Sequence, residues 1–195
     1  MPLPPAYYQS NDVVSLARDL LGRELVTCID GVITSGIITE TEAYRGPEDR
    51  ASHAWNNRRT SRTEVMFGAG GHAYVYLCYG IHQMMNVVTG PEDVPHAILI
   101  RAVHPLEGLE AMLHRRRLDR PRKGWTSGPG TVGQALGLHT RLTGSCLYDP
   151  DSPVQIRAGT ERPRPGEILA GPRVGIDYAG EDARLPWRFR WLPSR

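Results

Sequence analysis

GIITETEAYRGPEDRASHAWNNRRTSR, residues 36–62, is the most informative segment of the sequence for the expected fold. It opens as an apolar, β-branched strand, breaks at a Gly-Pro pair and then presents His53. Side chains of a strand alternate between its two faces, which predicts that Glu40, Glu42 and Tyr44 share one face. The alternate positions Ile37, Thr39, Thr41 and Ala43 then share the other face.

Two carboxylates on one strand face allow two interpretations. Unpaired buried charge is costly, so a buried strand that carries two carboxylates is expected to use them in catalysis or binding. An edge strand with a solvated acidic face is the simpler alternative. The stretch by itself leaves both interpretations open.

The chain as a whole has 195 residues, which predicts a single domain over residues 1–195. No apolar run is long enough to span a membrane. Residues 1–8 lack the basic-then-apolar pattern of a signal peptide. We therefore expect a cytoplasmic protein without a membrane partner. Cys28 and Cys78 lie in apolar runs and are expected to be buried thiols.

The basic residues are more informative than the net charge of +2. Lys123 is the only lysine, and all other basic side chains are arginines. Two local clusters contain Arg115, Arg116, Arg117, Arg120, Arg122 and Lys123, and Arg58, Arg59 and Arg62. Such clusters suit contacts with phosphate groups. A solvated surface helix is the alternative for the first cluster.

Hydrophobic periodicity predicts the order of the elements. An N-cap before Val13 and helical spacing predict a helix that ends at Gly22. Strands are expected at 23–29, 32–44, 73–79, 81–88, 97–103, 154–157, 173–176 and 187–191. Helical segments are expected around 63–67, over Leu106 to Leu113 and at 131–136. Hairpins with peripheral helices and no regular βαβ alternation predict one compact α+β domain.

Metal and nucleotide motifs are missing from the sequence. Seven histidines and three cysteines form no C-x-x-C or H-E-x-x-H pattern, so we expect no metal. The glycine-rich residues 68–71 lead into a strand without a following lysine, which argues against a phosphate-binding loop. We accordingly expect no cofactor.

Aromatic and polar side chains are dense around a few short strands. The residues concerned are Tyr44, Tyr74, Tyr76 and Tyr79, with Glu42, His53, His82, Asn86 and Arg101. Tyrosine combines a flat apolar face with a polar tip, which suits a planar heterocyclic ligand. Interleaved arginines and aromatics are also typical of nucleic-acid binding. A buried tyrosine cluster in a sheet is the alternative.

Several motifs in a consistent order carry a specific resemblance. They are residues 16–22 (LARDLLG), 40–44 (ETEAY), 46–49 (GPED), 51–53 (ASH), 66–67 (MF), 74–80 (YVYLCYG), 85–86 (MN), 99–102 (LIRA), 128–130 (GPG) and 173–176 (RVGI). Together they cover nearly the whole chain, which resembles the alkyladenine (3-methyladenine) DNA glycosylase family, the one without a helix-hairpin-helix. The resemblance implies a curved antiparallel sheet, base-excision repair of alkylated or deaminated purines, and no metal.

The resemblance also implies roles for individual residues. Glu42 matches the carboxylate that activates water, and Arg101 matches the arginine that helps to hold that water. The walls of the base pocket match Tyr44, His53 and Tyr76. Asn86 matches the asparagine that crowds the exocyclic amine of guanine. We expect Glu40 to be structural, and His53 to offer a hydrogen bond to a neutral base such as hypoxanthine.

The partner that the resemblance implies is double-stranded DNA containing damaged purines, bound by a monomer in the bacterial nucleoid. Tyr79, with Ile81 nearby, is expected to fill the gap left by a flipped nucleotide. Contacts with the DNA backbone are expected from Arg58, Thr60 and Arg62. The chain departs from the family at Thr131, where a basic residue is common, at His82 beside the expected wedge, and in the turn 92–96.

The lysine count bears on the mechanism. Glycosylases that also nick the strand use an amine to form a Schiff base, and Lys123 lies in a loop far from the motif cluster. The sequence therefore predicts a monofunctional enzyme in which water is the nucleophile. Two other hypotheses remain: a binding module for damaged nucleic acid without catalysis, and a formyl- or acyl-transferase relative, although nothing resembles its cofactor site.

Overall fold

The computed structural model describes residues 1–164 and 166–192. Its α-helices are α1 (Val13–Asp19), α2 (Leu109–Arg116) and α3 (Pro129–Ala135). Short 3-10 helices are η1 (Pro5–Gln9), η2 (Trp55–Asn57), η3 (Glu64–Phe67), η4 (Thr140–Leu142) and η5 (Asp177–Arg184). The strands are β1 (Glu24–Ile29), β2 (Val32–Arg45), β3 (Ala73–Cys78), β4 (His82–Thr89), β5 (His96–Glu107), β6 (Val154–Arg157), β7 (Ile168–Gly171) and β8 (Arg188–Trp191).

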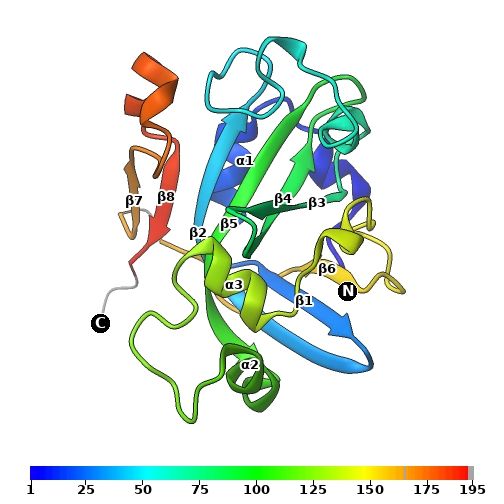
Figure 1. The fold of residues 1–195 in the computed structure, drawn as a ribbon, viewed down its shortest axis with the longest axis vertical. Coiled ribbons are helices and arrows are strands. Elements are labelled where there is room, and N and C mark those ends of the chain that lie inside the picture. The colour runs from blue at the N-terminus through cyan, green and yellow to red at the C-terminus, as the bar shows by residue number, and fades with distance from the viewer. Residues whose placement is uncertain (165, 193–195) are drawn as a thin grey trace.

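A single curled antiparallel sheet organises the domain, as the α+β prediction requires (Figure 1). Its strand order is β3-β4-β5-β2-β1-β6, and a β7–β8 hairpin joins through β8 to the middle of β2. The long β2 thus pairs with three strands. It is an interior strand rather than the edge strand of the alternative interpretation. Its acidic positions accordingly lie inside the domain.

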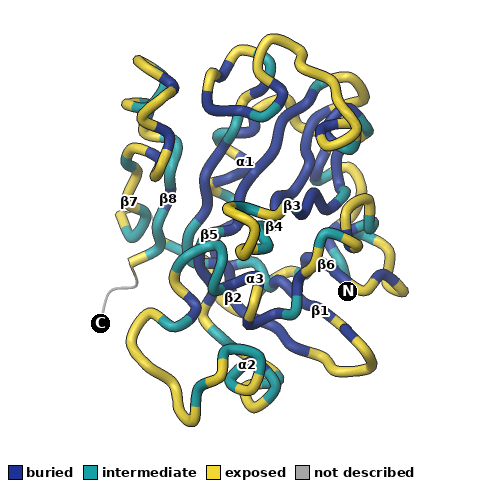
Figure 2. The backbone as a smooth tube through the Cα atoms, in the orientation of Figure 1, coloured by how far each residue is buried: buried dark blue, intermediate teal, exposed yellow. Residues whose placement is uncertain are grey.

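Helices cover the sheet and close the core. α1 packs against β2 and β5, while α3 packs against β4, β5 and α2. In the view of Figure 1, α1 lies behind the sheet and α3 in front of it. Figure 2 shows the central strands buried and the connecting loops exposed. The main core joins these layers through side chains such as Leu16, Leu20, Ile38, Ile98, Ile100, Val132 and Leu136.

The alternation predicted along residues 36–44 is wrong at its start. Two register shifts in the β2–β5 pairing flank Glu40, one at Thr39 and one at Arg101. Because a bulge inserts an unpaired residue, it reverses the faces on one side of it. Ile38, rather than Ile37, therefore joins Ala43 in the main core. Beyond the bulge, Glu40, Glu42 and Tyr44 share one face of the strand, as predicted.

Three further predictions differ from the structure. β5 continues through Pro105 to Glu107, so the following helix begins only at Leu109, because the prolonged β2–β5 pairing outweighs the helical spacing from Leu106. Residues 173–176 form no strand; the pairing segment of this region is β7, which the sequence did not reveal. Cys28 is exposed instead of buried, since its strand position faces outward, although all three thiols are free.

Candidate active site

The strand register assembles the site. Tyr74 pairs with Asn86, Asn86 with Leu99, and Leu99 with Glu42, so one row crosses β3, β4, β5 and β2. Residues directly opposite one another in an antiparallel pair point to the same face. Next to this row lies a cavity of about 570 Å³, within the range of small-ligand sites. Among its lining residues are Tyr44, His53, Arg62, Tyr74, Tyr76, Asn86, Leu99, Arg101 and Val174.

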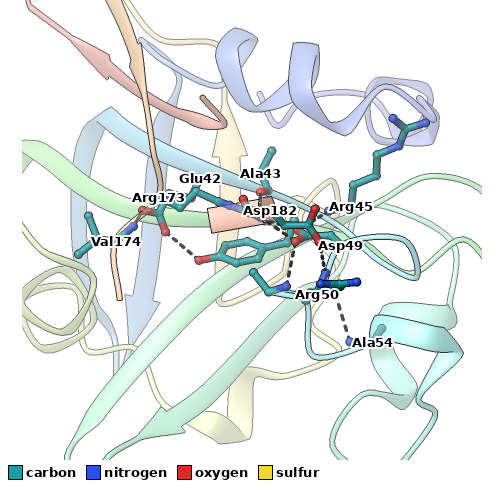
Figure 3. Close-up of polar contacts among 12 residues, drawn as sticks. Glu42, Ala43, Arg45, Asp49, Arg50, Ala54, Arg173, Val174 and Asp182 are labelled. Atoms are coloured by element: carbon teal, nitrogen blue, oxygen red, sulfur yellow. Dashed lines mark hydrogen bonds and ion pairs between the residues drawn. The ribbon is translucent and has the colours of Figure 1, made fainter. Parts of the chain in front are cut away.

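Glu42 is fully buried behind this cavity and is held by three donors. The Val174 backbone N–H donates to its Oε1 at 2.8 Å. Its Oε2 accepts from the Tyr44 hydroxyl at 2.8 Å and from Arg101 Nη1 at 3.3 Å. Figure 3 shows Val174 reaching Glu42 from a separate segment of the chain. An ionised carboxylate accepts about four hydrogen bonds, so one position remains.

The charge on Glu42 is set by opposing effects. Burial is the largest effect and leaves the pKa of Glu42 above its ordinary value, although Arg101, the Tyr44 hydroxyl, the Val174 N–H and Arg188 each lower it. Burial also lowers the pKa of Arg101, but the carboxylates of Glu42 and Glu40 more than offset this and raise it. Arg101 therefore stays charged beside Glu42, which favours the ionised carboxylate.

Glu40 has a different environment from Glu42, as expected. Its Oε1 accepts from Arg101 Nε at 2.8 Å and from Arg188 Nε at 2.6 Å. Arg188 belongs to β8, so Glu40 links β5 and β8 across β2. Glu40 thereby fixes the guanidinium that contacts Glu42, and this is consistent with a structural role.

A buried ion pair behind Tyr44 was missed by the sequence reasoning. Arg173 Nη1 forms a short contact with Asp49 Oδ2, and Nη2 donates to Asp49 Oδ1 at 2.8 Å, with both side chains fully buried. Arg173 also donates to the Ala43 carbonyl at 2.8 Å and lies 4.8 Å from the Tyr44 ring centre. Figure 3 shows this network joining the loop after β2 to the segment that carries Val174.

The pocket walls form the aromatic cluster predicted from the sequence. Tyr74 and Tyr76 have ring centres 5.6 Å apart, and His53 packs edge-on against Tyr76 at 4.7 Å. Tyr44 and Asn86 also line the cavity, and Asn86 donates to the backbone carbonyl of Tyr74 at 3.2 Å. The amide of Asn86 is therefore fixed by the strand that presents the aromatic rings.

Both ring nitrogens of His53 are engaged. Nδ1 lies 2.8 Å from the Tyr74 hydroxyl, and Nε2 lies 3.2 Å from Arg62 Nη2. Burial, together with the charges of Arg62 and Arg58, lowers the pKa of His53 to about 4. The ring is thus neutral near pH 7. In this arrangement, the side chain has no free N–H for the hydrogen bond that we expected it to give a neutral base.

The β3–β4 hairpin projects two apolar side chains beside the cavity. Tyr79 is 88% exposed and Ile81 is 72% exposed. Tyr79 and Gly80 both have positive φ angles, 50° and 72°, which hold the tip in a tight turn. His82 instead packs against α3, where an added Cβ on Gly130 would lie 2.6 Å from its ring. The hairpin therefore presents Tyr79 and Ile81 as the candidate wedge.

The expected DNA-backbone residues separate into two groups. Arg58 and Thr60 are exposed on the loop before η3. Arg62 is also exposed, but its guanidinium lies against the cavity wall, with its central carbon 4.9 Å from the Tyr76 ring centre. In the cluster that contains Arg115, the side chains of Arg115 and Arg116 donate to the backbone carbonyls of Ala135 and Trp125. These last two arginines therefore serve α2 packing.

The described residues hold neither a candidate metal centre nor a membrane-spanning helix. Within residues 1–164 and 166–192, no group of three or more His, Cys, Asp or Glu side chains is placed to hold a metal ion. Over the same ranges, no helix is long and apolar enough to cross a membrane.

Comparison with known proteins gives the family. The sequence model of the family described as methylpurine-DNA glycosylase matches residues 6–194, which defines the class of the chain as a DNA glycosylase. A protein of Chlamydia pneumoniae named "Putative 3-methyladenine DNA glycosylase" is 48% identical over 194 residues, covering 96% of this chain and 94% of that protein. A Bacillus cereus (strain G9842) protein of the same name is 44% identical over 195 residues, covering 97% of this chain and 95% of that protein. The chain belongs to the methylpurine-DNA glycosylase family.

Proposed function

We propose that this glycosylase flips alkylated or deaminated purines out of double-stranded DNA and hydrolyses their N-glycosidic bond with a water activated by Glu42. One observation carries the proposal: a fully buried carboxylate is fixed by Tyr44, Arg101 and Val174, and these three residues line an aromatic cavity. The substrate class comprises 3-methyladenine, 7-methylguanine and hypoxanthine.

Binding of the base rests on the aromatic walls. A base inside a duplex is out of reach, so the nucleotide must leave the stack. Tyr44 and Tyr76 then offer π faces to the flipped purine. A cationic alkylated purine gains about 0.5–2 kcal/mol over a neutral one from a cation–π interaction. The fixed amide of Asn86 restricts the space for an exocyclic amine.

Hydrolysis uses the remaining hydrogen-bond position on Glu42. A water held by Glu42 and Arg101 attacks C1′ of the sugar, and its proton passes to the Glu42 carboxylate. The bond between C1′ and N9 breaks, and its electron pair leaves with the base. The ionised carboxylate also stabilises the positive charge that develops on the sugar. A cationic purine leaves as a neutral molecule, whereas a neutral purine leaves as an anion that takes up a proton from solvent.

An excision assay on duplexes with one defined lesion tests the proposal. We expect the wild-type enzyme to release the free base and to leave an intact strand with an abasic site. Borohydride should trap no covalent adduct, because the single Lys123 lies in the loop before α3 and does not line the cavity. Strand cleavage or a trapped adduct would show a lyase step and contradict the water mechanism. Failure to release any modified purine would contradict the function itself.

Removing the candidate wedge should impair action on duplex DNA selectively. Unstacking costs a few kcal/mol per step, so Tyr79→Ala is expected to slow single-turnover excision from a duplex by roughly 10- to 100-fold. Tyr79 is exposed and contributes little to the core, so stability should be unchanged.

Single-stranded DNA with the same lesion is the internal control for this variant. A base that leaves single-stranded DNA opens no gap in a duplex stack, so Tyr79→Ala should reduce the excision rate much less on this substrate. An equal loss on both substrates would assign Tyr79 to the base pocket instead of to the wedge. Ile81→Ala tests the second exposed side chain of the hairpin in the same way.

A further inference from the structure

We propose that the Tyr74 hydroxyl donates a hydrogen bond to the flipped base, that Arg62 and His53 orient it, and that this bond selectively promotes excision of neutral purines. The proposal rests on the proposed function and adds a specificity residue to the same site. The sequence placed Tyr74 in the aromatic cluster but assigned no role to its hydroxyl.

The tautomer of His53 follows from its neighbours. Arg62 has only donors, so the contact of 3.2 Å from its Nη2 requires His53 Nε2 to be the acceptor. A neutral imidazole carries one proton, which must then lie on Nδ1. Nδ1–H therefore donates to the Tyr74 oxygen at 2.8 Å. The reverse assignment would leave Arg62 and His53 with two opposed N–H groups.

The same logic fixes the role of the Tyr74 oxygen. It accepts from His53 Nδ1–H and also from Arg62 Nε at 3.2 Å. A phenolic oxygen has two acceptor positions, and both are now filled. Only the hydroxyl proton remains, and residues 1–164 and 166–192 give it no acceptor. Tyr74 is 2% exposed and lines the cavity, so an acceptor for the hydroxyl proton has to lie in the cavity.

The hydroxyl keeps its proton near neutral pH. Burial raises the pKa of Tyr74, and Arg62 only partly opposes this. Tyr74 thus remains a donor under the conditions in which Glu42 acts as a base. A buried donor without a partner costs free energy, and an acceptor atom on a bound purine removes that cost.

The chemistry of the leaving group makes the bond selective. A neutral purine departs with negative charge spread over its ring nitrogens and any exocyclic oxygen, so a donor at that edge stabilises the departing anion. A cationic alkylated purine departs neutral and gains less from the same donor. The hydrogen bond therefore acts on the ratio of the two excision rates, not on the hydrolysis of every base alike.

Tyr74→Phe tests the proposal, because it removes the hydroxyl and leaves the ring and all charges in place. Single-turnover excision is measured on duplexes with hypoxanthine, a neutral base, and with 7-methylguanine, a cationic base. We expect the ratio of the hypoxanthine rate to the 7-methylguanine rate to fall by roughly 10- to 100-fold relative to wild type. Tyr148→Phe, the same change outside the cavity, should leave the ratio at the wild-type value.

The outcomes separate this proposal from the proposed function. If wild type excises both bases and Tyr74→Phe slows both equally, or slows neither, the directed hydroxyl is wrong while the glycosylase function stands. Wild-type excision of 7-methylguanine without any activity on neutral purines would also overturn the hydroxyl proposal. Absence of wild-type excision on both duplexes would instead overturn the proposed function. The melting temperature of each variant checks that its fold is intact.

Discussion

Glu42→Gln is expected to slow excision by about 10²- to 10⁴-fold and to leave the affinity for a lesion-containing duplex within a few-fold of wild type. Glutamine has the shape of glutamate, and its carbonyl oxygen still accepts the Val174 N–H. It cannot take a proton from water or neutralise the charge on the sugar. Single-turnover excision and fluorescence anisotropy with the same duplex measure the two properties separately.

Glu40→Gln is the matched control for this experiment. Glu40 lies two residues away, also contacts Arg101, and is bound by Arg188 instead of the Val174 amide. We expect a loss of less than about tenfold, since only the support of Arg101 is weakened. Wild-type excision by Glu42→Gln would contradict the role of Glu42 in activating water, whereas a damage-binding module without catalysis would show no excision even by the wild-type protein.

The second large effect concerns stability. Asp49→Asn should lower the free energy of unfolding by about 3–5 kcal/mol, because it leaves the buried guanidinium of Arg173 without a counter-charge. Both side chains have no exposed surface, and the pair joins segments 124 residues apart. Urea unfolding at neutral pH measures the loss. Excision should fall as well, since Arg173 precedes Val174 and packs on Tyr44.

The neighbouring carboxylate supplies the control. Glu48 is 69% exposed and pairs with Arg45 on the surface. Glu48→Gln should change the free energy of unfolding by less than about 0.5 kcal/mol. Equal effects of Asp49→Asn and Glu48→Gln would show that the Asp49–Arg173 pair contributes little to stability beyond a surface charge. Wild-type excision by a destabilised but folded Asp49→Asn protein would show that the pair does not position the Val174 amide.

Much of the site could be predicted because it follows strand periodicity. Glu42 and Tyr44 lie two residues apart on β2, so alternation alone placed them on one face, and the structure joins them by a hydrogen bond. Tyr74 and Tyr76 repeat the same spacing on β3. Antiparallel pairing then brings both strands to one cavity, although the register itself had to come from the structure. The α+β class followed from the hairpin pattern.

The rest of the site depends on contacts that local sequence does not encode. The bulge at Thr39 has no Gly or Pro to mark it, so strict alternation placed Ile37, instead of Ile38, on the same face as Ala43. The β-branched residues Val174 and Ile176 predict a strand at 173–176. The segment instead forms a loop whose Val174 N–H contacts Glu42. The contacts of the exposed Arg62 with Tyr74 and His53 were also not predicted, because an arginine in a polar loop is expected to face solvent alone.

The position of Val174 also determines when the site can form during synthesis. The aromatic walls and Glu42 all belong to the first half of the chain, which leaves the ribosome early. The amide that holds Glu42 Oε1, the partner of Asp49 and the strand beside Glu40 arrive only with residues 173–191. A nascent or interrupted chain therefore carries the pocket walls without the contacts that hold Glu42, so the proposed reaction requires residues 173–191 to be in place.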